Sequence, residues 1–288
     1  INTGARVLKN STGYNLTQLM VGSEGTLGII TKATFRLLPY PKHTMLLLVP
    51  FCSAEKACEA VSAIFQGGIT PSGMEFMERD AIDYALKFVD NVELPIGEDV
   101  QAHLLIEVDG NYPETLMKDC EAIAEIVMNF GASEPLFADN DKDKASLWTL
   151  RRRVGEAVKS HSIYKEEDTV VPRAELANLL RSVKALGAKY GFKSVCYGHA
   201  GDGNLHVNIL KEEMSDKAWA EDLPLAIREL FAVVKALGGT ISGEHGIGYV
   251  QKEYMDIVFN SVELNLQKES KKVFDPQGIL NPGKVFPQ

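Results

Sequence analysis

The stretch that decides the fold is residues 197–208, Tyr-Gly-His-Ala-Gly-Asp-Gly-Asn-Leu-His-Val-Asn. His199 and His206 stand seven residues apart, a spacing that two turns of a helix would also allow. Two glycines between them disfavour a helix, because each costs about 1 kcal/mol in a helix interior. The Asp-Gly pair lies between two apolar runs, residues 192–197 and 205–210, and therefore predicts a β-hairpin.

A two-residue turn at 202–203 would fix the register of this hairpin. It would pair His199 with His206 and Tyr197 with Asn208, all on one face. Directly opposed Cβ atoms lie about 4.5–5.5 Å apart, so two imidazole nitrogens could reach one metal ion at about 2.0–2.1 Å each. The hairpin alone leaves two interpretations open, a metal site and a pair of solvent-facing histidines.

A second motif, residues 240–248, places Glu244 and His245 inside a run of glycines. Glycine lets the backbone approach a ligand closely. Two histidines and one carboxylate, with coordination positions left open, are typical of a catalytic metal site. His245 beside a cation would stay neutral and could accept a proton. The alternative is a glycine-rich loop whose glutamate caps a helix beginning near residue 247.

Composition sets wider limits. The chain has 288 residues, enough for one large or two ordinary domains. Its net charge of −9 disfavours a nucleic-acid partner. No apolar run approaches the length of a membrane-spanning helix, and the four cysteines show no CxxC spacing, which predicts reduced thiols in a cytosolic-type protein. The chain opens at Ile1 rather than Met, so we expect N-terminal residues to be missing.

The middle of the chain alternates short strands with helices. The sequence predicts strands over 45–50, 72–78 and 103–109, and helices over 54–65, 79–89 and 114–130. This order predicts an α+β fold, an antiparallel sheet with helices on one face. His103 is expected to be a buried strand residue rather than a ligand.

A further helix is predicted over 139–160 and carries three consecutive arginines, 151–153. Because they point in three directions, one can point inward, where it needs an anion such as a substrate carboxylate. Lys165 follows in a charged segment. The alternative for both is a charged surface. Beyond the hairpin we expect a helix over 216–237, broken at Pro224, and a largely helical segment over 249–274.

The N-terminal segment contains a glycine-rich loop, residues 22–28. Its glycines could admit a phosphate or a flat ring system to the backbone, although the pattern is neither GxGxxG nor a P-loop. The alternative is a tight turn that leads into a strand over 29–37.

Four motifs occur in one order: residues 22–29, 198–206, 243–248 and 275–284. Together they resemble the FAD-linked oxidases of the vanillyl-alcohol oxidase superfamily, over essentially the whole chain. The most similar branch holds the glycolate oxidase catalytic subunit, D-lactate dehydrogenase and D-2-hydroxyglutarate dehydrogenase. The resemblance implies the end of an FAD-binding domain over 1–40, a substrate (cap) domain over 41–274 with a helix-covered antiparallel sheet, and a tail over 275–288 that returns to the flavin. Family members are longer, so we expect this chain to be a fragment that binds FAD poorly by itself.

The resemblance also implies roles for individual residues. His199, His206 and Glu244 match the metal ligands, for which Zn is favoured and Mn or Fe are alternatives. His245 matches the general base, and Arg151, Lys165 and Asn208 match substrate contacts. Gly155 falls where the hydroxyglutarate enzymes have a threonine. The implied FAD contacts are Gly22, Ser23, Glu24, Gly25, Thr26, Gly28, Ile29 and Asn281.

The function that the resemblance implies is FAD- and metal-dependent oxidation of glycolate, D-lactate or D-2-hydroxyglutarate to the 2-oxo acid. The electron acceptor would be a quinone, an electron-transfer protein or oxygen. We expect a cytoplasmic location or a peripheral one at the inner face of the membrane, as a homodimer or with related oxidase subunits. Two rivals are a non-catalytic subunit of a related complex and a metal-dependent hydrolase. An intact ligand set argues against the first, and the FAD-contact matches argue against the second.

Overall fold

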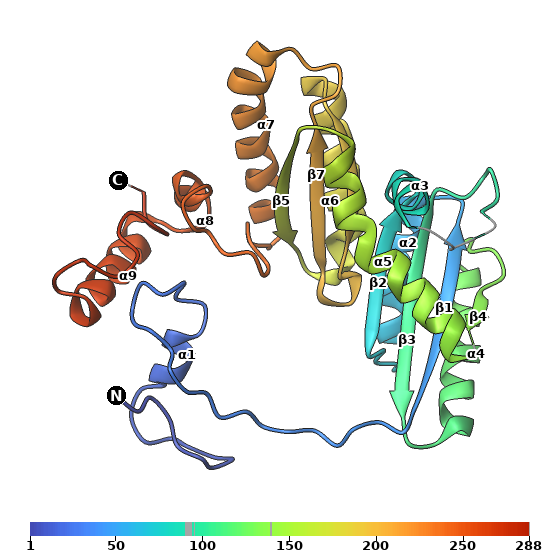
Figure 1. The fold of residues 1–288 in the computed structure, drawn as a ribbon, viewed down its shortest axis with the longest axis horizontal. Coiled ribbons are helices and arrows are strands. Elements are labelled where there is room, and N and C mark those ends of the chain that lie inside the picture. Colours follow the sequence, from blue (N-terminus) through green and yellow to red (C-terminus); the bar gives the residue numbers. More distant parts are fainter. Residues whose placement is uncertain (90–93, 95, 139, 288) are drawn as a thin grey trace. The chain divides into compact units, whose positions relative to one another are not determined.

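The computed structural model of the protein describes residues 1–89, 94, 96–138 and 140–287. The chain divides into two compact units (Figure 1). The large unit is Tyr40–Gly243, and the small unit combines Ile1–Pro39 with Glu244–Gln288. The domains expected from the sequence also separate an N-terminal segment near residue 40, but they group residues 244–274 with the sheet. The two divisions therefore differ for these residues.

The large unit is built on one seven-stranded sheet in the order β4-β1-β3-β2-β6-β7-β5. Every pair of neighbouring strands is antiparallel. The antiparallel sheet of an α+β fold, which the sequence predicts, is therefore confirmed. The strands are β1 (His43–Phe51), β2 (Gly73–Glu78), β3 (Ala102–Gly110), β4 (Leu136–Ala138), β5 (Tyr164–Val170), β6 (Lys193–Gly198) and β7 (Asn204–Leu210).

Both faces of this sheet are apolar, and both carry helices. Successive strand residues point to opposite faces, yet Leu46, Leu47, Leu48 and Val49 of β1 are all buried. Leu46 and Leu48 form one apolar cluster with α3 (Arg79–Phe88) and α5 (Asp141–His161). The other face of the sheet is covered by three helices that do not belong to that cluster. They are α2 (Ala54–Gln66), α4 (Pro113–Met128) and α6 (Leu176–Tyr190).

The sequence predicted helices on one face of the sheet only. The structure has helices on both faces, so this part of the prediction is wrong. A sheet that is apolar on both sides needs two covering layers, and Figure 1 shows α5 crossing in front of the sheet. The expected start of α5 at residue 139 lies outside the described residues. The remaining long helix, α7 (Asp216–Ala236), contacts β5 and continues through Pro224 without the predicted break.

The hairpin of β6 and β7 forms, but its register differs from the predicted one. His206 pairs with Tyr197 rather than His199, and Asn208 pairs with Val195. The connection is longer because residues 200–202 form a 3-10 turn before Gly203, whose φ is +75°. A shift of two residues keeps every side chain on its own face of the sheet, so His199 and His206 still approach each other.

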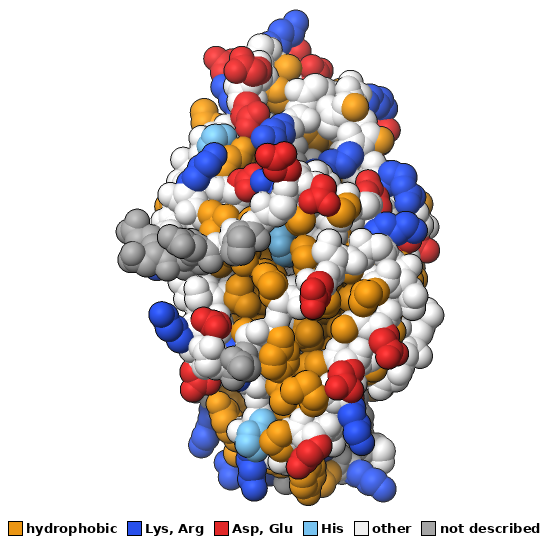
Figure 2. Space-filling model, turned by 90° about the vertical axis from the view of Figure 1, so that its right-hand side faces the viewer, with side chains coloured by type: hydrophobic (Ala, Val, Ile, Leu, Met, Phe, Trp, Pro, Cys, Tyr) orange, Lys and Arg blue, Asp and Glu red, His pale blue; other side chains and the backbone are white. Residues whose placement is uncertain are grey.

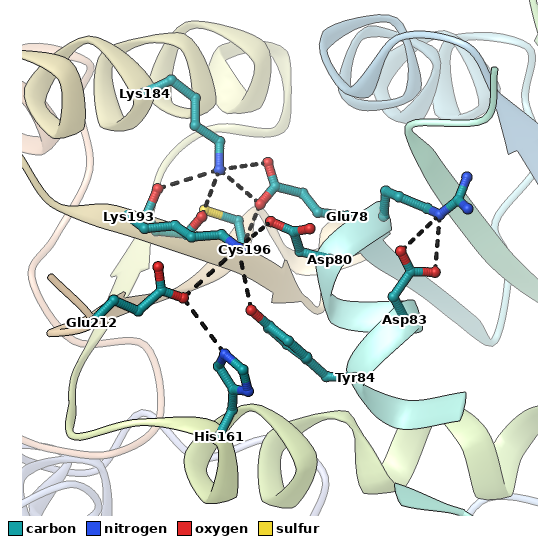
Figure 3. Close-up of polar contacts among 11 residues, drawn as sticks. Glu78, Asp80, Asp83, Tyr84, His161, Lys184, Lys193, Cys196 and Glu212 are labelled. Carbon is teal, nitrogen blue, oxygen red and sulfur yellow. Dashed lines mark hydrogen bonds and ion pairs between the residues drawn. The ribbon is translucent and has the colours of Figure 1, made fainter. Parts of the chain in front are cut away.

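A buried carboxylate extends the contact between β2 and β6, which pair at only two positions. Glu78 accepts a hydrogen bond from the backbone nitrogen of Cys196 at 2.7 Å and one from Nζ of Lys184 at 2.8 Å (Figure 3). Burial raises the pKa of Glu78, and Lys184 supplies the opposing charge. This cluster ties α6 to the strands and includes none of the predicted site residues.

The small unit consists of α1 (Leu16–Met20), α8 (Met255–Val258), α9 (Ser261–Phe274) and turns. The strand predicted over 29–37 does not form, because none of the described residues pairs with this segment. The helical stretch expected over 249–274 is divided, since Asn260 begins α9 through a capping box with Glu263. Among the described residues, no helix has the length and apolar character that crossing a membrane requires.

Figure 2 looks onto the side of the large unit where β1, β4 and α4 lie, and apolar side chains gather across it. Exposed apolar residues of these elements include Leu136 and Phe137 in the edge strand β4 and Met117 and Met128 in α4.

Candidate functional site

One row across the sheet brings three polar side chains to the face that α5 covers. Asp168 of β5 pairs with His206 of β7, and His206 pairs with Tyr197 of β6. The Tyr197 and His206 rings lie 5.4 Å apart between centroids, and Oδ1 of Asp168 lies 3.6 Å from Nδ1 of His206. Burial raises the pKa of Tyr197, so this hydroxyl stays protonated at neutral pH.

Asp168 is fixed by more than its strand. Its side chain accepts hydrogen bonds from Nδ2 of Asn204 at 2.7 Å and from the backbone nitrogen of Gly243 at 2.8 Å. A side chain at position 243 would meet Nδ2 of Asn204 at 2.7 Å, so the glycine permits this close approach. The carboxylate thus anchors the last residue of the large unit, directly before Glu244 in the chain.

His199 lies just past the end of β6 and turns its ring toward His206. The two ring centroids are 5.7 Å apart with the planes at 78°, and ring nitrogens of the two residues lie within 4.8 Å of each other. Nδ1 of His199 lies 2.9 Å from Oε1 of Glu75. Because Nδ1 is engaged by this carboxylate, Nε2 is the nitrogen that His199 would offer to a metal ion.

Glu75 of β2 is a site residue that our sequence reasoning missed. Its other oxygen, Oε2, accepts hydrogen bonds from Nε of Arg151 at 3.0 Å and from Nη2 at 2.7 Å. Burial alone would raise the pKa of this carboxyl, but His199 and Arg151 outweigh burial and lower it. The signal in the sequence was a charged residue inside the apolar strand Gly-Met-Glu-Phe-Met.

Arg151 is the inward-pointing arginine that the triplet predicts. It is buried, whereas Arg152 and Arg153 are exposed. Its guanidinium lies 5.5 Å from the centre of the Tyr197 ring and pairs with Glu75. The anion that holds Arg151 inward therefore comes from the protein itself. A guanidinium has five N–H donors, and Glu75 engages two of its three nitrogens.

Lys165 does not lie on the sheet face that carries His206 and faces Arg151. It pairs with Ile209 in the ladder, next to Glu166 paired with Asn208, and adjacent strand residues face opposite sides. Its Nζ lies 3.4 Å from Oε1 of Glu167, which is on that other face. Lys165 therefore faces away from the site residues, and its contact with a substrate stays a prediction. Lys159 of α5 supplies a cation on the site face instead, 2.7 Å from Glu166.

Asn208 lies on the site face, as expected for a substrate contact. Its side chain is fully buried, and within the described part of the chain neither its oxygen nor its amide nitrogen has a hydrogen-bond partner within 3.5 Å, although it lies close to the Tyr197 hydroxyl. A buried amide without partners costs free energy. This side chain is suited to a polar ligand that supplies both a donor and an acceptor.

In the small unit, three of the four motifs meet. The carboxylate of Glu24 accepts hydrogen bonds from the backbone nitrogens of Ile247 at 2.8 Å and Gly248 at 2.7 Å. Its carbonyl oxygen accepts one from Nδ2 of Asn281 at 2.5 Å. A side chain on Gly246 would meet the Glu24 carboxylate at 2.9 Å. The loop over 22–28, the segment after His245 and the C-terminal turn thus form one cluster.

The other predicted FAD contacts lie along the same loop. Gly22, Gly25, Glu24 and Asn281 all have positive φ values. Thr26 is buried, and Nζ of Lys271 donates a hydrogen bond to its carbonyl at 2.9 Å. Of the remaining predicted contacts, Ser23 and Gly28 are half-buried and Ile29 is exposed, and Glu244 and His245 are exposed as well.

The donor set fits a divalent metal. His199 and His206 offer ring nitrogens within reach of one ion, and a carboxylate orients one of the two rings, as in many metal sites. The small unit fits FAD in a narrower sense. Its loop exposes backbone at Gly22, where a side chain would meet no atom within 4 Å.

Comparison with known proteins identifies the family. The model of the family "FAD linked oxidases, C-terminal domain" matches residues 40–285. The chain belongs to this family, which confirms the resemblance found in the sequence.

Two curated relatives are each 36% identical over 99% of this chain. They are the D-lactate dehydrogenase of Anaerostipes hadrus, of which 61% is covered, and the glycolate oxidase subunit GlcD of Bacillus subtilis, of which 60% is covered. The D-2-hydroxyglutarate dehydrogenase of Stutzerimonas stutzeri is 31% identical over 97% of this chain and 60% of that protein. The chain therefore spans about 60% of the length of these relatives.

Solved structures share the fold. The 4-ethylphenol oxidase from Gulosibacter chungangensis has a TM-score of 0.61 at 15% identity, over 88% of this chain and 56% of that one. A p-cresol methylhydroxylase with substrate bound has a TM-score of 0.61 at 12% identity, over 87% of this chain and 54% of that one.

Proposed function

We propose that the protein containing this chain is an FAD- and metal-dependent dehydrogenase or oxidase that converts a D-2-hydroxy acid to the 2-oxo acid. The observation that carries the proposal is the pair His199 and His206, held beside Arg151 and Asn208 on one face of the sheet. Membership of the FAD-linked oxidase family supports the flavin, and the names of the relatives support a hydroxy acid.

The chain offers residues for both cofactors. Bound FAD would accept the hydride from the substrate carbon, and the small unit would contact it through the loop over 22–29 and Asn281. A divalent metal held by His199, His206 and Glu244 would act as a Lewis acid on the substrate hydroxyl. Glu244 follows Gly243 directly, and Asp168 fixes Gly243, so chain continuity supports its inclusion in this set.

Substrate binding is assigned to two side chains of the large unit. Arg151 binds the substrate carboxylate with the donors that Glu75 leaves. The unpaired amide of Asn208 hydrogen-bonds to a polar group of the substrate. His245 takes the proton of the hydroxyl as the hydride leaves the carbon, so the substrate loses two electrons and two hydrogens.

The charges on the site face favour a substrate with one carboxylate. Two cations on that face already have a carboxylate at 2.7 Å, Arg151 with Glu75 and Lys159 with Glu166. Glu166 pairs across the ladder with Asn208, so a second substrate carboxylate near Asn208 would meet an anion. Gly155 stands where the hydroxyglutarate enzymes have a threonine, and a side chain at this position would meet the Tyr197 hydroxyl at 3.1 Å. We therefore favour glycolate or D-lactate over D-2-hydroxyglutarate.

The test is reduction of the flavin without oxygen. The protein, purified with FAD at its natural length, is mixed in a stopped-flow instrument with glycolate, D-lactate, L-lactate or D-2-hydroxyglutarate, and bleaching of the flavin band is followed. We expect rapid bleaching by a D- or achiral monocarboxylate only. His245→Ala should slow bleaching by about 10²–10⁴-fold while FAD content is unchanged. No bleaching by any of these acids would refute the proposal.

A further inference from the structure

One carboxylate in the large unit divides its two oxygens between a histidine and an arginine. Oε1 of Glu75 lies 2.9 Å from Nδ1 of His199, and Oε2 accepts both hydrogen bonds from Arg151. The side chains of Glu75 and Arg151 are only 10% and 9% exposed. Water therefore competes little for either contact, and the three side chains form one connected network.

We propose that Glu75 is a positioning residue that couples the metal ligand His199 to the carboxylate-binding Arg151. This inference rests on the proposed function of this face, and it adds to that function a residue with a defined role. Glu75 itself touches neither metal nor substrate in this account. It acts on the reaction only through the two side chains that it orients.

Glu75 acts on the histidine through its Oε1. A carboxylate that accepts a proton from Nδ1 fixes the tautomer, aims the ring and makes Nε2 a better donor to a metal. In many metal sites the loss of such a partner costs about 10–100-fold in metal affinity. The same carboxylate restrains the guanidinium, whose planar donor geometry makes its orientation matter for recognising a second carboxylate.

The metal site and the carboxylate-binding site are coupled because one rigid group, the carboxylate of Glu75, makes both contacts. A substrate carboxylate that draws Arg151 away from Oε2 leaves more negative charge on Oε1 for His199. A metal on His199 pulls on the carboxylate in the opposite sense. By linkage, metal and carboxylate must then change each other's affinity by the same factor.

The chain supplies a matched control, Glu107 on the neighbouring strand β3. Glu107 lies on the same sheet face and also ties the sheet to α5, because its Oε2 accepts a hydrogen bond from Nε1 of Trp148 at 2.9 Å. Its described contacts include no histidine. Glu107→Gln therefore reports the effect of loosening α5 alone.

The experiment compares wild type, Glu75→Gln, Glu75→Asp and Glu107→Gln, each purified at natural length. The first readout needs no metal: nitrogen-15 spectra of labelled histidine in the metal-free protein. We expect His199 in the wild type and in Glu107→Gln to carry its proton on Nδ1, and we expect both Glu75 variants to lose this preference. An unchanged tautomer in Glu75→Gln would overturn the proposal. Glu75→Asp keeps the charge but shortens the side chain, so it serves if the glutamine variant folds poorly.

The second readout is zinc affinity, measured against a chromophoric chelator with and without glycolate. We expect Glu75→Gln to bind zinc about 10–100-fold more weakly and Glu107→Gln to match the wild type. Because glycolate also contacts the metal directly, we expect it to shift the zinc affinity of both proteins, but by a larger factor in the wild type than in Glu75→Gln. Equal zinc affinity in wild type and Glu75→Gln would overturn the inference alone. Absence of zinc binding in the wild type, with the expected tautomer, would instead refute the metal site of the proposed function and the coupling with it.

Discussion

The backbone of Gly203 lies directly against the carbonyl of Val171: a Cβ atom at position 203 would stand 2.0 Å from that oxygen. The φ of Gly203 is +75°, a conformation that other residues adopt at a cost. This glycine ends the turn between the two histidines, and the backbone nitrogen of Val171 bonds to its carbonyl at 3.0 Å. The hairpin that presents His206 is thus locked to the end of β5.

Gly203→Ala should therefore destabilise the protein by more than the penalty for positive φ alone, which is about 1–2 kcal/mol. Gly191 at the end of α6 is the control, because its φ is +76° but a side chain there would meet no atom within 4 Å. Urea unfolding of both variants measures the difference. Equal losses of unfolding free energy would show that the contact with Val171 relaxes freely.

The buried His103 should make the free energy of unfolding decrease in acid. It is 2% exposed, and burial, with a smaller effect of Arg79, lowers its pKa from 6.5 to about 4. Between these values the unfolded chain binds a proton that the folded protein does not, so stability falls as the pH falls from about 6.5 to about 4. The decrease amounts to about 3 kcal/mol.

His103→Leu should remove this decrease. The free energy of unfolding, measured by urea titration at pH 7, 5.5 and 4.5, should depend less on pH in the variant than in the wild type. The comparison uses slopes, so a constant effect of the substitution on packing cancels. Parallel pH dependences would contradict the assignment of a neutral buried His103.

Arg151 and Lys165 are expected to differ in their importance for turnover. Arg151→Met should lower kcat/KM by about 10–150-fold, which is the fold-change that corresponds to the free energy of one hydrogen bond to a charged group. Lys165→Met should lower it less than threefold, because the ladder turns this side chain to the other face. Steady-state kinetics with glycolate and D-lactate measure both, and thermal melts check the fold. A large loss in Lys165→Met would mean that Lys165 does reach the substrate.

Much of the fold could be predicted because the patterns are local. Largely apolar runs of six or seven residues located the strands β1, β2 and β3, of which β1 and β3 extend to nine residues. The two-faced burial of β1 was also visible in the run Leu46 to Val49, but we assigned helices to one face only. The strand expected over 29–37 has the right residues, yet a strand also needs a partner, which residue patterns do not reveal.

The site was predicted in part for a similar reason. Asp-Gly indicated a hairpin correctly, but the 3-10 turn at 200–202 shifted the register by two residues. The pair His199 and His206 survived because a shift of two preserves the face. Glu75 was missed because its role depends on β2 lying beside β6, a contact between residues 124 positions apart in the chain. Lys165 faces the other side of the sheet in this structure, and its contact with the substrate stays a prediction.

The most direct test of the account is the metal content of the protein, purified at its natural length without added metal, beside His199→Ala and His206→Ala. Inductively coupled plasma mass spectrometry gives the number of Zn, Mn and Fe ions per chain. We predict roughly one divalent ion in the wild type and almost none in either variant, with FAD content unchanged. A wild type without metal, or variants that retain it, would contradict the claim that these two histidines form a metal site.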